Sequence, residues 1–199
     1  VTNSYKDQID VSSIVSSSLI DNTAAIADIL NNSKTELGQT GVIGAVNKLD
    51  SSSNTLVMGM RNNVAVANKS SVVGFNQTAN AINYTSISGA DSTVNNTNYV
   101  YTTGINNTIN NAENVIALGN NMVVGSATTT AKNSILLGNH IAFASKDNMA
   151  NAVSIGDYSR ANTGAMAVGV SAQALGEDSI AIGRDAIATG SIATGSSAR

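Results

Sequence analysis

Few residues in this chain are of types that carry chemistry, and they are scattered. His140 is the only histidine and there is no cysteine, which excludes thiol catalysis, disulfides and thiolate metal sites. A lone histidine after a glycine, in "LLGNH", is typical of a solvated turn residue, so no metal site is expected. No G-x-S-x-G elbow, P-loop, HExxH pair or EF-hand loop is present. We therefore expect no enzyme activity and no cofactor.

Two polar stretches are candidate ligand-binding loops. "SATTTAKN" (126–133) and "SKDNMAN" (145–151) lie in the two longest gaps between regularly spaced glycines. Extra length in a repeat forms surface loops, often on the binding face, although a tolerated insertion without function explains it equally well. The candidate residues are Thr128, Thr129, Thr130, Lys132, Lys146, Asp147, Asn148 and Met149.

The composition argues against charged partners. Charged residues make up 12% of the chain and the formal net charge is −3. Without a cluster of Lys and Arg, we expect no nucleic acid partner and no contact of this segment with a membrane surface. No run approaches the roughly eighteen apolar residues of a membrane helix. Val1 does not begin a signal peptide, which is typical of a mature segment or an excised fragment.

Regularly spaced glycines predict a solenoid. Six are separated by fifteen residues each: Gly44, Gly59, Gly74, Gly89, Gly104 and Gly119. Five more follow at intervals of 19, 18, 13, 14 and 12 residues: Gly138, Gly156, Gly169, Gly183 and Gly195. We expect an all-β fold, in which each interval is a flattened coil of two short strands and two turns. At about 4.8 Å per rung, ten intervals give a rod about 48 Å long. Asparagine pairs such as Asn106/Asn107 and Asn120/Asn121 predict the turns, because asparagine tolerates positive φ.

The main predicted strand of each coil is apolar on both faces. Residues one and three positions before the glycine share one face, and residues two positions before it lie on the other. Since the coil interior covers only one face, the other is left exposed and predicts face-to-face association of chains, which cyclic symmetry would close. We expect the residues two positions before the glycine to form this interface. They are Val42, Val57, Val72, Ala117, Ala167, Ala181 and Ala193.

The first forty residues follow a different pattern. "DNTAAIADILNNSKTELG" combines cap-type residues, apolar residues at helical spacing and a terminal Gly38, which predicts a helix over about 23–37. The open end of a solenoid has to be covered. We therefore interpret residues 1–40 as an N-terminal capping segment and 41–199 as the solenoid.

"SIAIGRDAIATGSIATG", with "AVSIGDYSRANTGAMAVGVSAQALGEDSIAIG" before it, resembles the head repeats of trimeric autotransporter adhesins, the YadA-like head. The likeness is strong over 152–198 and looser but periodic over 41–151. It implies a left-handed parallel β-roll with three chains side by side, on a bacterial cell surface. It also implies a stalk and an outer-membrane anchor, both absent from this chain, and virulence-related binding to host receptors or extracellular-matrix proteins.

Three alternatives compete with an adhesin head. The trimeric β-helix of acyltransferases is also rich in Ile, Val and Gly, but it has eighteen-residue coils, which five intervals of fifteen contradict. An ice-binding solenoid needs a regular threonine array, whereas Thr102, Thr128 and Thr189 fall at unrelated rung positions. A purely structural spacer within a surface fibre fits the repeat equally well.

Overall fold

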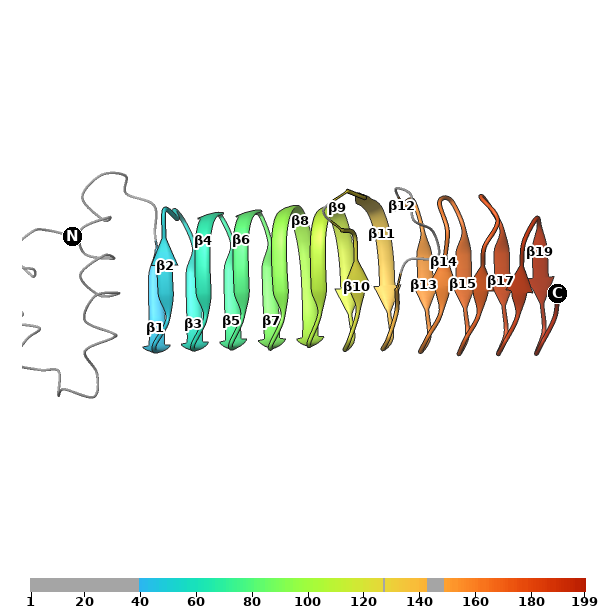
Figure 1. Cartoon of the computed structure of the whole chain (residues 1–199), viewed down its shortest axis with the longest axis horizontal. Coiled ribbons are helices and arrows are strands. Elements are labelled where there is room, and N and C mark those ends of the chain that lie inside the picture. The colour runs from blue at the N-terminus through green and yellow to red at the C-terminus, as the bar shows by residue number, and fades with distance from the viewer. Residues whose placement is uncertain (1–39, 127, 143–148) are drawn as a thin grey trace, which may run out of the picture.

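The computed structural model describes residues 40–126, 128–142 and 149–199, which form a parallel β-solenoid without a helix. Figure 1 shows a rod in which successive rungs stack from the blue end to the red end. The helix predicted over 23–37 lies outside the described residues, as does the capping segment apart from Thr40. The strands are β1 (Gly41–Ala45), β2 (Lys48–Asp50), β3 (Leu56–Met60), β4 (Asn63–Asn68), β5 (Ser71–Phe75), β6 (Thr78–Asn83), β7 (Ser86–Ala90), β8 (Thr93–Ile105), β9 (Thr108–Leu118), β10 (Val123–Val124), β11 (Ala131–Leu137), β12 (Met149–Ala150), β13 (Val153–Ile155), β14 (Arg160–Ala161), β15 (Met166–Val168), β16 (Gln173–Ala174), β17 (Ile180–Ile182), β18 (Ile187–Ala188) and β19 (Ile192–Thr194).

The strand register confirms the predicted repeat. Along the path β1-β3-β5-β7-β8-β9-β11-β13-β15-β17-β19 every neighbour is parallel, and Gly59 pairs with Gly74 fifteen residues later. A regular eighteen-residue coil does not fit the fifteen-residue register of these rungs. Gly89 has φ +128°, and a Cβ there would lie 1.8 Å from the carbonyl oxygen of Gly104. Glycine is therefore required where rungs approach most closely.

Each fifteen-residue rung turns at three corners, not at the predicted two. In the rung after Gly59, positive φ marks Arg61, Val66 and Lys69, which we name the first, second and third corners. The prediction was wrong because Val64 and Val66 look like one strand, whereas the second corner turns Val66 outward, where it is 56% exposed. Asparagine occupies many corners, as predicted. These corner asparagines are Asn54, Asn76, Asn96, Asn106, Asn111, Asn114, Asn121, Asn133 and Asn151.

The corners divide a rung into three sides. The long side, which includes β1, β3, β5 and β7, leads into the ladder glycine. A second side joins the first corner to the second, and a short side of two residues, such as Thr97 and Asn98, joins the second to the third. β8 and β9 continue around the second and third corners without a break.

The prediction of which long-side face points outward was wrong. The seven proposed interface residues point into the coil: Val57, Val72, Ala117, Ala167 and Ala181 are fully buried in the single chain, Ala193 is 4% exposed, and Val42 is partly buried against the core. The space inside a coil is narrow, so the smaller side chains must face inward. In the rungs after Gly156 most inward residues are alanines.

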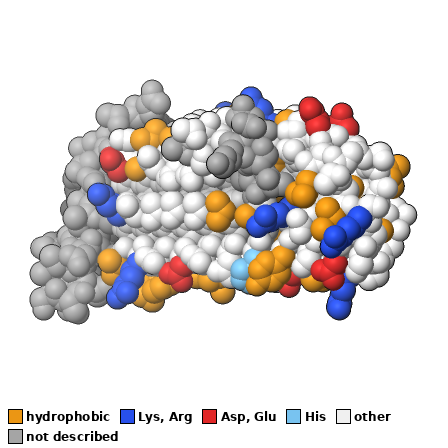
Figure 2. Space-filling view, turned by 45° about the vertical axis from the view of Figure 1, so that its right-hand side comes forward, with side chains coloured by type: hydrophobic (Ala, Val, Ile, Leu, Met, Phe, Trp, Pro, Cys, Tyr) orange, Lys and Arg blue, Asp and Glu red, His pale blue; other side chains and the backbone are white. Residues whose placement is uncertain are grey.

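The outward face of the long side consists of residues one and three positions before the glycine. Its most exposed large side chains are between 36% and 65% exposed, whereas Leu118, Ile155 and Ile180 on the same face are only partly exposed. The most exposed are Ile43, Met58, Tyr101, Ile116, Ile135, Met166, Ile182 and Ile192. Figure 2, which shows one face of the rod, has hydrophobic side chains along its lower edge and, with charged side chains between them, on its right-hand part.

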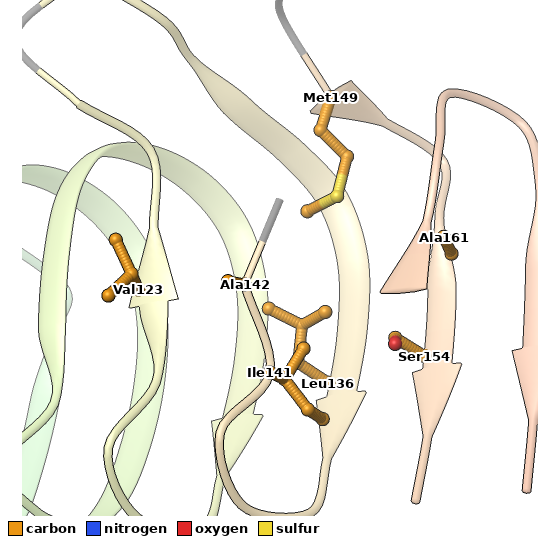
Figure 3. A pocket seen from close by; sticks show the side chains of 7 residues that line it. All are labelled: Val123, Leu136, Ile141, Ala142, Met149, Ser154 and Ala161. Carbon is orange, nitrogen blue, oxygen red and sulfur yellow. The ribbon is translucent and has the colours of Figure 1, made fainter. Parts of the chain in front are cut away.

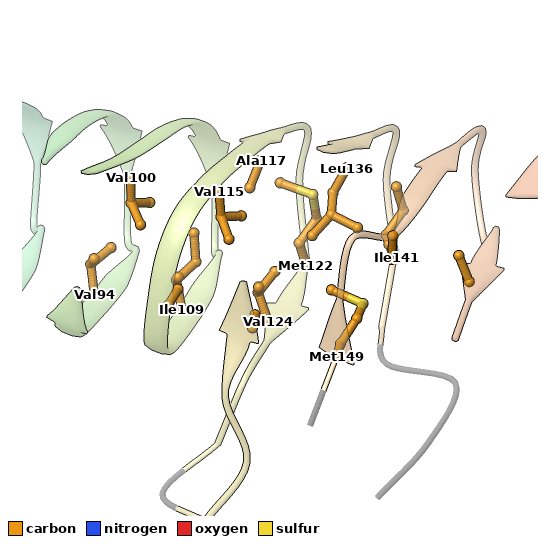
Figure 4. Close-up of a cluster of buried hydrophobic side chains, with 14 of the residues drawn as sticks. Val94, Val100, Ile109, Val115, Ala117, Met122, Val124, Leu136, Ile141 and Met149 are labelled. Carbon is orange, nitrogen blue, oxygen red and sulfur yellow. The ribbon is translucent and has the colours of Figure 1, made fainter. Parts of the chain in front are cut away.

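The core changes character at the insertions. Val and Ile fill the earlier rungs, mostly Ala and Ser the later ones, and the largest side chains lie between. In Figure 3, Leu136, Ile141 and Met149 surround a small apolar space that is too narrow for a water molecule. Figure 4 places the same three beside Met122 and Val124 in one continuous cluster. This space joins a wide coil to a thin one and is not a ligand site.

Candidate functional site

Both insertions leave the coil at the second corner. Val124 is the last paired residue of the second side in its rung, and Ala131 is the first on the short side. In the next rung Ala142 and Met149 lie on the same two sides. The two candidate loops therefore begin from one corner of consecutive rungs, a proximity that the sequence alone does not reveal.

Ser126 organises the first of these two loops, which joins Val124 to Ala131. The Ser126 hydroxyl accepts hydrogen bonds from the backbone N–H groups of Thr128 (3.2 Å) and Thr129 (3.1 Å). The Ser126 N–H donates to the Thr129 carbonyl at 3.1 Å, which closes a tight turn. Thr128 is exposed, while Thr129 and Thr130 are half-buried. Local hydrogen bonds thus fix the loop against the solenoid.

A polar groove of about 490 Å³ lies beside this loop. Thr130 and Lys132 line it at the loop, and the remaining residues come from the second corner and the short side of three rungs. These are Ala81, Asn83, Asn96, Thr97, Asn98, Asn111, Ala112 and Glu113. Sequence reasoning found only Thr130 and Lys132, because the other residues meet through the rung register.

Side-chain hydrogen bonds run along the groove from rung to rung. Asn68 Nδ2 donates to Asn83 Oδ1 (3.1 Å), and Asn83 Nδ2 donates to Asn98 Oδ1 (3.0 Å). Beyond Asn98 the column continues with Glu113 and Lys132, whose charged atoms are 3.2 Å apart. Both charged side chains are about half exposed, so their attraction is weak and adds little stability.

A second row of amides lies at the second corner. Asn96 Nδ2 donates to Asn111 Oδ1, and Asn111 Nδ2 donates to the carbonyl of Ser126. This row connects the groove to the candidate loop. The two rows together give a fixed set of uncharged amide donors and acceptors.

The second candidate loop falls mostly outside the described residues, including Lys146, Asp147 and Asn148. Met149 is described, and its placement corrects the prediction that it contacts a ligand. It is 4% exposed and packs into the core at the start of β12. Although it follows a polar insertion, Met149 fills the wide part of the coil interior.

His140 lies at a first corner, as expected for a turn residue. Its ring stacks on Tyr158 of the next rung, with centroids 4.5 Å apart and planes within 3°. Within residues 40–126, 128–142 and 149–199 no three His, Cys, Asp or Glu side chains are grouped to hold a metal. In the same ranges no helix is long and apolar enough to cross a membrane.

These observations define a class of protein: a parallel β-solenoid with a weakly charged, amide-rich surface and an exposed apolar side. The family model described as the YadA head domain repeat matches residues 161–186 in two copies. The match lies in the short C-terminal rungs, from the end of β14 through β17, and confirms the resemblance to the YadA-like head of trimeric autotransporter adhesins. No curated protein matches the chain.

The matched family also indicates the kind of surface. A YadA-like head is an adhesin-type domain exposed on bacteria, and it is an adhesive or structural module instead of an enzyme. Heads of this family form homotrimers and bind host proteins. The handedness of the coil and the oligomeric state of this chain stay predictions.

Proposed function

We propose that this chain is the head of a bacterial surface adhesin, a homotrimer that attaches the cell to host cells or extracellular matrix by multivalent protein contacts. The observation that carries the proposal is the outward apolar face of the long side. Ile43 and Ile192, near the two ends of the rod, are 57% and 65% exposed. Exposed apolar side chains recur in the rungs on both sides of Gly89, where Ser86 and Ser88 hold the outward positions, and such repeated exposure is typical of an interface.

The number of copies is taken from the matched family, whose heads form homotrimers. The long side is one continuous sheet from β1 to β19, and cyclic symmetry closes such faces around a shared axis without leaving an edge. The second corner then points away from the axis. The loop residues Thr128, Thr129, Thr130 and Lys132 are the proposed contacts with host receptors, and Lys146, Asp147 and Asn148 belong to the companion loop.

The rest of the assembly follows from the adhesin role. We place the head at the cell surface, linked to the outer membrane through a stalk and an anchor outside this chain, where binding to host receptors contributes to virulence. Residues 1–40 are the proposed cap of the solenoid end. Three rigidly held copies of each loop convert weak contacts into avid attachment.

The proposal is tested by measuring how well chains that no longer form trimers attach to host cells. Ile116→Asp combined with Ile182→Asp puts two charges on the outward face without touching the core, so we expect monomers in sedimentation that attach to host cells far less than the parent. Asn80→Asp, on an exposed position of the second side, is the matched control and should stay trimeric. A monomeric parent, or equal attachment by the double variant, would refute the mechanism. A trimer that attaches to no cell or matrix would instead support a spacer.

A further inference from the structure

The groove beside the first loop has a volume and a lining that suit a ligand. Its volume of about 490 Å³ falls within the usual range of small-ligand sites. It lies at the second corner and the short side, apart from the outward apolar face of the long side. Assembly through the long side therefore leaves it open in each copy.

The lining combines groups that both donate and accept. Asn83, Asn96, Asn98 and Asn111 each carry an amide oxygen and an amide NH₂, and Thr130 adds a hydroxyl. A sugar hydroxyl also donates and accepts, so a polyhydroxylated ligand can satisfy such a surface from either side. The only apolar lining residues are Ala81 and Ala112, which give an apolar peptide little to bury.

The charges of the groove argue for a neutral ligand. Lys132 is its only cation, and its amino group lies 3.2 Å from the Glu113 carboxylate. That carboxylate would repel an anionic ligand, which would have to displace it from Lys132. A neutral ligand can accept from Lys132 and donate to Glu113 without breaking the pair.

The amides are held in position before any ligand arrives. Asn98 Oδ1 accepts from Asn83 Nδ2, which fixes the Asn98 side chain and directs its own NH₂ away from Asn83. At the second corner Asn111 is held between Asn96 and the Ser126 carbonyl. Because β8 and β9 carry these residues on a continuous ladder, little conformational entropy is lost on binding.

We propose that this groove is a binding site for a short neutral oligosaccharide, such as a glycan chain on a host surface. The inference rests on the proposed adhesin function and names the ligand class of the surface beside the first loop. A shallow polar groove binds each chain weakly, and three grooves on one trimer supply the avidity.

The test uses an array of immobilised neutral tri- to pentasaccharides, with sialylated and sulfated forms of the same chains, probed with the parent trimer. We expect binding to neutral members and about tenfold weaker binding for Asn98→Ala. Lys132→Ala, outside the amide rows, should weaken it by about fivefold and serves as the second variant. Asn80→Ala changes the same residue type in the rung of Asn83 but outside the groove, so it should bind like the parent.

Circular dichroism and sedimentation establish that each variant is a folded trimer before its binding is compared. Binding confined to sialylated or sulfated chains would overturn the proposal, as would unchanged binding by both groove variants. A trimer that attaches to host cells yet binds no saccharide on the array would also overturn it, while leaving the adhesin function intact.

Discussion

The fifteen-residue rungs and the short C-terminal rungs close the same first corner by different means. In the long rungs a buried amide lies three residues after the glycine: Asn62 Nδ2 donates to the carbonyl of Gly74 in the next rung at 3.0 Å, and its Oδ1 accepts from the N–H of Gln77 at 3.0 Å. In the short rungs Ala186 has this position, and its backbone N–H donates to the Gly183 carbonyl at 3.4 Å.

This difference explains why rung length is constant in one region and variable in the other. A side-chain amide that bonds to the next rung needs a partner at the same place in every rung. Buried polar side chains that accept from a backbone N–H of the next rung recur fifteen apart until Met122 ends the series: four amides and one serine, Asn47, Asn62, Gln77, Ser92 and Asn107. A backbone turn is complete within its own rung, so the later glycines are free to lie 13, 14 and 12 residues apart.

The largest expected effect comes from the tight stacking in the regular region. Gly89→Ala places a Cβ 1.8 Å from a backbone carbonyl of the next rung at a φ of +128°, so neither the rung nor the residue can adapt. We expect a loss of about 4 kcal/mol or more in unfolding free energy, measured by urea denaturation. Gly190→Ala, where a Cβ would meet nothing within 4 Å, is the control and should change stability little. Equal losses in the two variants would show that stacking does not select glycine.

The amide ladder itself accounts for the next effect. Asn62→Ala leaves the carbonyls of Met58 and Gly74 without its amide donor and the N–H of Gln77 without its acceptor, at a fully buried position. We expect a loss of about 3 kcal/mol in unfolding free energy, because unpaired buried groups keep their desolvation cost. Asn63→Ala, exposed in the same rung, should lose less than about 0.5 kcal/mol. A nearly neutral Asn62→Ala would mean that backbone turns can replace the ladder here too.

Sequence periodicity predicts the rungs but does not decide which strand face is internal. Ala181 and Ile182 are neighbours in the strand, so they lie on opposite faces, and both faces are apolar. Which face points inward is therefore decided by the size of side chain that fits inside a coil. A signal was present: the residues two before the glycine shrink to alanine in the rungs whose opposite strand also carries Ala172 and Ala174, while the alternate residues stay large. A thin coil needs small side chains on both inner surfaces, which identifies that face as internal.

The candidate site was predicted in part for a similar reason. Extra length at 126–133 marks a surface loop at residues 126 and 128–130, whereas residues 131–133 belong to β11 and Ala131 is buried. The groove beside that loop depends on register, because Asn83, Asn98 and Glu113 are fifteen residues apart and become neighbours only once the rungs stack. The buried amides were missed because asparagine was interpreted only as a turn residue.

Opposite substitutions in the wide and the thin core should each lower the unfolding free energy by a smaller amount. Val72 and Ala181 hold equivalent inward positions in the two regions, and both are fully buried. Val72→Ala should lose about 2 kcal/mol of unfolding free energy by leaving a cavity, and Ala181→Val about 1 to 3 kcal/mol by overpacking. Urea denaturation measures both. A stabilising Ala181→Val would show that the short rungs have room for larger residues and are not thin.

The smallest effect belongs to a ladder at the third corner, found only in the regular region. Lys69 Nζ donates to Tyr84 Oη at 2.7 Å, and Tyr84 stacks on Tyr99 with ring centroids 4.7 Å apart. The pKa of Lys69 is raised above its ordinary 10.5, chiefly by this hydrogen bond. A pKa that is higher in the folded state than in the unfolded state stabilises the fold at pH values below the unfolded-state pKa. This contribution disappears as the pH rises through the folded-state pKa. Because Lys69 is fully exposed, stability should hardly change, whereas NMR titration of Nζ should show a higher midpoint in the parent than in Tyr84→Phe. The same midpoint in both proteins would mean that the rung-to-rung bond does not persist in solution.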